Sequence, residues 1–355
     1  MGRWPVPETG AGPRNGWSGM TRRGWSLFAA MCVIWGIPYL LIRVAVRDIE
    51  PGTLVFARTA IGGLILLPIA LRRGGFGPVL RRWRPLLVFT VIELAVPWLL
   101  LGSAEKQLSS SLSGLLVAAV PLIGVLLARV TGADERVEPS RAAGLLLGVL
   151  GVAMLVGLDF GQIHIASLVE MLVVVVGYAV GPVIMARRLA DLPSIPVVSA
   201  AMLLCAAGYL PYAALNAPSH VAGNVVASVV VLGVVCTALA FVLFFALIND
   251  IGPARATVIT YVNPAVAVLF GIALLGEKFT LGMAVGFPLI LAGSVLGARR
   301  SAVREAAVAE PVAVAICDEA QSSRTSPEAV SKTAARTPVS SSDGSSHSTS
   351  MPSSG

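Results

Sequence analysis

Two charged side chains lie inside otherwise apolar stretches, and their types make them the first candidates for chemistry. Glu93 lies near the middle of VFTVIELAVPWLLLG, and Arg58 lies in LVFARTAIGG. A carboxylate that stays ionised inside a bilayer costs a few kcal/mol, so it must face a cavity, a partner or a proton. Glu93 is therefore predicted to carry a proton or to bind a cation. A buried carboxylate with a purely structural role is the alternative.

Arg58 has two chemical roles open to it. Its planar guanidinium suits the capture of an anionic substrate group, and it equally suits pairing with a carboxylate such as Glu93. Extension of the side chain to the membrane surface explains its position just as well. For Arg43, which lies nearer the end of its apolar stretch, extension to the surface is the favoured interpretation.

Aromatic and amide side chains within the apolar stretches suit the walls of a mostly apolar pocket with a few polar groups. Each of them has packing in the core or against lipid as its alternative. Together with Arg58, those that we expect at a substrate site are Trp35, Trp98, Tyr178, Tyr261 and Asn263.

Ten apolar stretches must position these residues. The chain has 56% apolar and 13% charged residues and a mean hydropathy of +0.83, which excludes an ordinary soluble domain. A helix of about 20 apolar residues crosses the hydrocarbon core of a bilayer. The predicted fold is therefore an all-α integral membrane protein with ten transmembrane helices, at 25–46, 53–71, 85–104, 109–130, 142–158, 166–186, 195–215, 222–248, 254–276 and 281–298.

The sequence repeats itself with a unit of about 143 residues. Glu135 is followed by Gly144 and Gly151 at the same spacings at which Glu277 is followed by Gly286 and Gly293. Five helices fall in each half, and an odd number of spans makes the two repeats inverted relative to each other. The GxxxG pairs at 144–148 and 282–286 predict that the fifth and tenth helices are packing elements.

Prolines recur at equivalent positions of the two repeats. A proline inside a helix removes one hydrogen bond, and in membrane carriers such interruptions often line the binding site. Pro121 and Pro264 match each other in the repeat, so we predict helix breaks at both that border the substrate site.

The loop charges predict the orientation of the chain. One side holds only Arg47, Lys106 and Lys278, which makes the other side the cytoplasmic one. We therefore expect a multi-pass protein of the cell membrane with both termini in the cytoplasm. The arginines of the cytoplasmic loops are Arg72, Arg73, Arg81, Arg82, Arg84, Arg129, Arg136, Arg141, Arg187, Arg188 and Arg255.

Composition divides the chain into four parts. Residues 24–159 and 160–300 form the two predicted repeats, preceded by a Gly/Pro/Arg-rich segment at 1–23. Residues 301–355 are rich in Ala, Ser, Thr and Pro. We expect both terminal segments to be disordered, because such compositions bury too little apolar surface to fold.

Several function classes find no support in the sequence. It contains no HExxH, Walker or GxSxG motif, which predicts a protein that is not an enzyme, with no catalytic residues and no cofactor. The four cysteines have neither zinc spacing nor a disulfide pattern, so no metal is expected. The net charge of +7 lies in loop arginines that orient a membrane protein, so no nucleic-acid partner is predicted.

Three segments resemble a known family: FARTAIGGLILL, VAAVPLIGVLLA and ATVITYVNPAVAVLFGIALLGEKFTLGMAVGFPLILAG. They resemble the two EamA-type repeats of the drug/metabolite transporter superfamily, and the likeness extends over residues 25–298. The resemblance implies a ten-helix inverted-repeat carrier, often an exporter of amino acids, other metabolites or toxic compounds, with a central cavity walled by helices 1, 3, 4, 6, 8 and 9. On that pattern Trp35, Glu93, Trp98, Tyr178, Tyr261 and Asn263 lie on cavity-forming helices. Arg58 matches the arginine of helix 2, for which the resemblance also implies a structural role.

The function predicted from these observations is secondary active export of a small metabolite, amino acid or drug-like solute by alternating access, in exchange for protons. The partners expected are the solute, the lipid bilayer and protons. A facilitator or exchanger of sugar-like or phosphorylated metabolites, with Arg58 as the anion contact, is the alternative within transport. A membrane sensor or scaffold that moves nothing is the alternative from another class.

Overall fold

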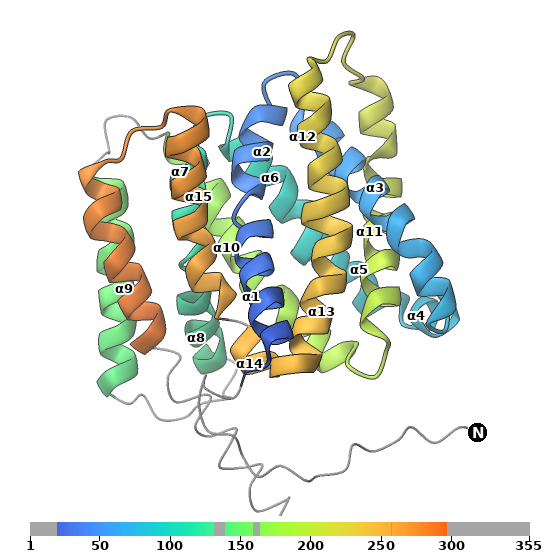
Figure 1. Ribbon diagram of the computed structural model, residues 1–355, viewed down its shortest axis with the longest axis horizontal. Helices are drawn as coiled ribbons and strands as arrows, with labels where there is room; N and C mark the ends of the chain where they lie inside the picture. Colours follow the sequence, from blue (N-terminus) through green and yellow to red (C-terminus); the bar gives the residue numbers. More distant parts are fainter. Residues whose placement is uncertain (1–19, 131–138, 159–163, 257, 297–355) are drawn as a thin grey trace, which may run out of the picture. The chain divides into compact units, whose positions relative to one another are not determined.

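The computed structural model describes residues 20–130, 139–158, 164–256 and 258–296, and all regular secondary structure in these ranges is helical. Residues 1–19 of the predicted N-terminal segment at 1–23, the predicted C-terminal segment at 301–355 and the loop that contains Glu135 lie outside the described residues, whereas residues 22 and 23 are helical. Seven described segments are long and apolar enough to cross a membrane, and three shorter apolar helices complete the ten predicted spans (Figure 1).

The first repeat begins with a broken span and continues through four more. Thr21 caps the first helix, because its side chain accepts a hydrogen bond from Gly24 N at 2.9 Å, so helix formation starts at Arg22, slightly earlier than predicted. The elements of this half are α1 (Arg22–Ile34), α2 (Pro38–Ala45), α3 (Pro51–Arg72), α4 (Gly77–Arg81), α5 (Trp83–Phe89), η2 (Thr90–Ala95), α6 (Val96–Ala104), α7 (Ser110–Val117), α8 (Val120–Val130) and α9 (Pro139–Gly157).

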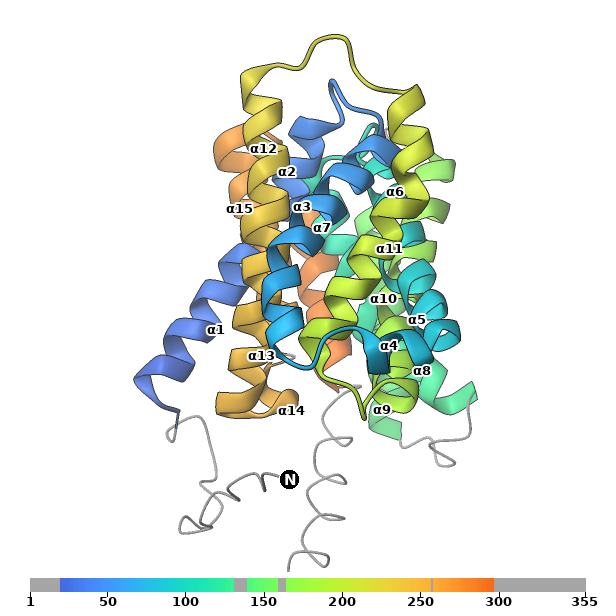
Figure 2. The same cartoon turned by 90° about the vertical axis from the view of Figure 1, so that its right-hand side faces the viewer.

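The second repeat has the same succession of spans in the opposite direction, as Figures 1 and 2 show. The end of the bundle where α1 begins is called the Thr21 end below, and the end that holds the loop between α2 and α3 is called the Asp48 end. The elements are α10 (Ile165–Arg188), α11 (Ser194–Leu215), α12 (Gly223–Gly233), η4 (Val234–Leu239), α13 (Ala240–Ile251), α14 (Pro253–Ala256), α15 (Ile259–Leu275) and a last helix at Leu281–Leu296.

A π-helical turn interrupts the third span of each repeat. η2 and η4 begin 144 positions apart, which places them at equivalent points of the two repeats. In η2 the wider turn is closed by a hydrogen bond from Val96 N to Val91 O, and Pro97 then supplies no N–H to the helix. Such turns are rare and frequently occur at functional sites.

The two repeats differ in their first and fourth spans. In the first repeat the helix is interrupted at 35–37, between α1 and α2, and again at 118–119, between α7 and α8. At the equivalent positions of the second repeat, α10 and α15 are continuous. Two similar sequences therefore adopt different conformations in one molecule.

The fifth and last spans pack through their glycines, as predicted. A Cβ on Gly151 would lie 2.8 Å from Gly286 O, and a Cβ on Gly293 would lie 2.7 Å from Gly148 Cα. The two backbones are therefore in contact, which only residues without a side chain allow.

Candidate functional site

Arg58 lies in the interior of the bundle, where three spans meet. Its side chain is 7% exposed, its Nε donates a hydrogen bond to Thr237 Oγ1 at 2.8 Å, and its guanidinium carbon lies 3.7 Å from the centre of the Trp98 ring. Thr237 belongs to η4 and Trp98 to α6, the helix that follows η2. The arginine therefore does not extend to the membrane surface.

No carboxylate forms an ion pair with Arg58 among the residues that the structure describes. The predicted pairing with Glu93 is absent. A buried guanidinium is stable only when its N–H groups find acceptors, and here a neutral hydroxyl and an aromatic ring face it.

Two tyrosines extend this group of residues. Tyr178 of α10 packs against both large apolar cores, and it interacts electrostatically with Arg58. Tyr39 of α2 is 8% exposed and also interacts with Arg58. Of the predicted substrate residues, the structure thus brings Arg58, Trp98 and Tyr178 together and adds Tyr39, in an apolar surrounding with a few polar groups that suits a small organic molecule.

Glu93 lies on η2, against α10. A Cβ on Gly181 would collide with the Glu93 carboxylate, and a Cβ on Gly177 would lie 2.6 Å from Ile92 O, so the glycines of α10 make room for the π-helical turn. Glu93 Oε2 is buried and has no hydrogen-bond partner among the residues that the structure describes. A proton on this carboxyl group removes the cost of burying its charge.

Trp35 and Asn263 occupy a neighbouring region, where the first span is interrupted. Trp35 packs on Phe241 and Phe244 of α13, with ring centres at 6.0 and 4.7 Å. In the amide orientation that matches donors to acceptors, Asn263 donates to Cys32 O at 3.1 Å and to Ile259 O at 2.9 Å. The amide therefore fixes the interrupted first span to α15.

Tyr261 and Pro264 are less closely tied to the group around Arg58. Among the described residues no contact joins the partly exposed Tyr261 to Arg58. The predicted break at Pro264 is not observed, because α15 continues through it. Pro121 does lie at an interruption, directly after residues 118–119.

Sequence reasoning missed two residues near this group. Thr237, the acceptor for Arg58, carries no signal in the sequence, because threonine is common in membrane helices. Glu105 follows an apolar stretch directly and is fully buried, and the Arg43 guanidinium donates to its backbone carbonyl. Arg43 therefore turns towards protein, although extension to the membrane surface was favoured for it.

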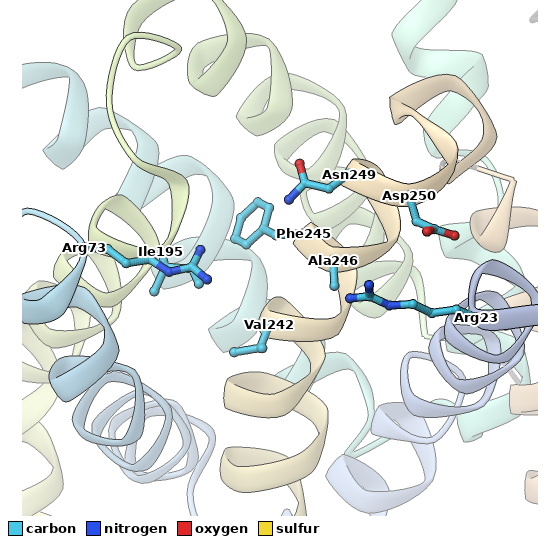
Figure 3. A pocket seen from close by; sticks show the side chains of 8 residues that line it. All are labelled: Arg23, Arg73, Ile195, Val242, Phe245, Ala246, Asn249 and Asp250. Carbon is cyan, nitrogen blue, oxygen red and sulfur yellow. The ribbon is translucent and has the colours of Figure 1, made fainter. Parts of the chain in front are cut away.

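A cavity of about 380 Å³ lies at the Thr21 end. Figure 3 shows Arg23 and Arg73 reaching from opposite sides towards α13 side chains, including Phe245 and Asn249. Most of the side chains that line the cavity belong to α13, which directly follows η4 and its Thr237 and extends towards the Thr21 end. No pattern in the sequence indicates this cavity.

Comparison with known proteins gives one family. The model of the EamA-like transporter family matches twice, at residues 22–157 and 166–298. YedA of Escherichia coli K12, described as an uncharacterized inner membrane transporter, is 30% identical over 264 residues, which are 71% of this chain and 82% of YedA.

More distant relatives agree with this. An uncharacterized transporter of Archaeoglobus fulgidus is 24% identical over 78% of this chain and 99% of its own length. YvbV of Bacillus subtilis, also described as an uncharacterized transporter, is 26% identical over 79% and 93% of the two chains. A solved crystal structure matches with a TM-score of 0.57 and 25% identity, over 78% of this chain and 98% of the other. The chain is a multi-pass membrane protein that belongs to the EamA-like transporter family.

Proposed function

We propose that this transporter moves a small organic solute with an anionic group by alternating access. The observation that carries the proposal is the difference between the repeats: the first span is interrupted between α1 and α2, whereas its counterpart α10 is continuous, and the fourth span is interrupted at a different point in each repeat, between α7 and α8 and between α14 and α15. In a carrier built from inverted repeats, exchange of the two conformations between the repeats converts a state open to one side into a state open to the other.

The anionic group of the solute binds Arg58. This arginine is buried and contacts the hydroxyl of Thr237 in η4 and the indole of Trp98 in α6. Its planar fork fits a carboxylate or a phosphate, and the side chains of Trp98, Tyr39 and Tyr178 are suited to the apolar part of the molecule. Amino acids and other organic acids have this combination of groups.

Proton exchange is the coupling that we propose, with Glu93 as the proton carrier. Its buried carboxylate oxygen without a partner supports this role. Export is the proposed direction, with the Thr21 end in the cytoplasm as the loop arginines indicate. The cavity beside Arg23 and Arg73 would then admit an anionic solute from the cytoplasm.

A facilitator or exchanger of phosphorylated metabolites is the second candidate, and the same unpaired Arg58 favours it. The two differ in their response to a pH gradient, because only proton exchange uses one. Membership of a transporter family favours either carrier over a sensor or scaffold.

The test is uptake of labelled amino acids, organic acids and sugar phosphates into proteoliposomes, with and without an imposed pH gradient. Arg58→Gln removes the charge, and we expect a loss of about 10- to 100-fold in uptake of anionic solutes, since a charged hydrogen bond contributes about 1.5–3 kcal/mol. Arg82→Gln is the matched control, because Arg82 forms an exposed ion pair with Asp191 at 2.9 Å.

Glu93→Gln should abolish the effect of the pH gradient and leave the protein folded. Uptake that follows the gradient in this variant would refute the role of Glu93. Equal uptake by wild type and Arg58→Gln would refute the role of Arg58 in binding the solute.

A further inference from the structure

A second buried carboxylate lies at the Asp48 end, outside the group around Arg58. Glu105 follows the last residue of α6 and is 0% exposed, and within the described part of the chain neither of its carboxylate oxygens has a hydrogen-bond partner. Ser110 and Ser113 of α7 are also fully buried with unpartnered hydroxyl groups. A structural carboxylate normally accepts several hydrogen bonds, so this one requires an explanation.

Charged and titratable groups of both repeats interact with Glu105. Arg43 attracts it and also donates to its backbone carbonyl, Glu277 repels it, and Arg58 adds a weaker attraction. Tyr39 and Tyr178 interact with it from α2 and α10. No cation forms an ion pair with Glu105 among the residues in the described ranges.

The Glu277 carboxylate is bound to the N-terminus of α7. It reaches α7 from the loop after α15 and accepts hydrogen bonds from Ser110 N at 2.7 Å, from Ser111 N at 2.9 Å and from Ser111 Oγ. Glu277 is thus held by α7, and its charge opposes the charged form of Glu105.

Burial therefore opposes the charged form of Glu105. It raises the pKa of Glu105 well above its ordinary value, and the neighbouring Arg43 offsets this only in part. Glu105 also lies near a contact between the two repeats, because Glu277 of the second repeat interacts with it and accepts a hydrogen bond from Ser110 of α7 in the first repeat.

We infer that Glu105 is a proton-binding site that controls closure of the Asp48 end. In the closed arrangement described here one Glu105 oxygen carries a proton, which makes the carboxyl group neutral. When this end opens, water reaches the group, the proton leaves to water, and the carboxylate is ionised. A proton taken up from the Asp48 side thus favours closure, which is the step that a proton-driven exporter needs after releasing its solute. The inference rests on the proposed alternating access.

The test measures opening without any solute. Ser113→Cys, in a background in which the four native cysteines are replaced, places a reporter at a position that is 0% exposed in the closed state. A membrane-impermeant maleimide is applied to protein in proteoliposomes, and the rates are divided by those of the exposed reporter Gln107→Cys to remove the pH dependence of the thiol. We expect labelling to rise with pH by up to about tenfold per pH unit through the transition, as one linked proton requires.

Glu105→Gln imitates the protonated group, so its labelling should stay slow at every pH. Glu50→Gln is the matched control, because Glu50 pairs with Lys106 at the same end and is exposed. Arg43→Met removes the nearest positive charge and should shift the transition to higher pH. In infrared difference spectra, one band of a protonated carboxylic acid should be lost in Glu105→Gln, and that same band should persist in Glu93→Gln.

Labelling of the wild type that does not depend on pH would overturn the inference, and so would an unchanged pH dependence in Glu105→Gln. If Glu105→Gln does not fold, Arg43→Met provides the test, because a labelling transition at the same pH as in the wild type would also overturn the inference. The labelling assay contains no solute, so its result does not depend on the uptake assay. If labelling depends on pH but no solute is transported in the uptake assay, the proposed function is refuted and the proton site at Glu105 is retained.

Discussion

The hydrogen bonds that Glu277 makes to α7 allow a quantitative prediction. α7 begins with Ser110, and the first two N–H groups of this helix donate to the Glu277 carboxylate, while Ser109 Oγ accepts from Leu112 N at 3.1 Å. Glu277→Ala leaves two N–H groups at this partly buried helix end without their acceptor. Water can replace the carboxylate only in part.

The magnitude follows from these bonds. Loss of a helix cap costs about 1–2 kcal/mol, and loss of a negative charge beside a helix N-terminus costs about 0.3–1 kcal/mol. With the second backbone bond included, we expect Glu277→Ala to destabilise the protein by about 2–4 kcal/mol. Glu277→Gln should cost roughly half of this, because one amide oxygen can still accept a hydrogen bond while the amide nitrogen faces a donor.

Thermal unfolding of the purified protein in detergent, followed by tryptophan fluorescence, is the assay. A change of about 2–4 °C per kcal/mol gives an expected loss of about 4–16 °C for Glu277→Ala. Glu50→Gln, which breaks an exposed ion pair, should cost less than about 1 kcal/mol. If Glu277→Ala unfolds at the same temperature as this control, the carboxylate does not hold α7 and the argument fails.

Two glycine substitutions test the other close approaches. Gly181→Ala introduces a methyl group that collides with the Glu93 carboxylate, so we expect proton-driven uptake to fall at least about tenfold. Gly208→Ala is the control, because its methyl group meets open space and should leave uptake unchanged. Equal uptake by the two variants would contradict the placement of Glu93. Gly286→Val forces the last helix away from Gly151 and should lower the unfolding temperature by several degrees, a result that the same change at Gly124, where nothing lies within 4 Å, should not reproduce.

The membrane spans and the repeat could be read from the sequence, because both depend on local patterns. A bilayer requires about 20 apolar residues for each crossing helix, so the run lengths alone predict ten helices. The GxxxG pairs at 144–148 and 282–286 likewise predict that the fifth and last spans are packing elements, and the structure shows that these two spans pack against each other. These predictions depend on lengths and spacings within short stretches of sequence, and none of them requires the distant contact partner of a residue to be known.

The partners of the polar residues were decided by the tertiary structure. Arg58 and Thr237 are 179 positions apart, and Ser110 and Glu277 are 167 apart. No local pattern records such pairs, which is why the sequence left ion pairing with Glu93 open for Arg58 and gave no weight to Glu105. The prolines also show what the sequence leaves undecided, because the helix is interrupted beside Pro121 but continues through Pro264 in α15. A proline removes one donor wherever it occurs, and the surrounding helices determine whether the backbone breaks there.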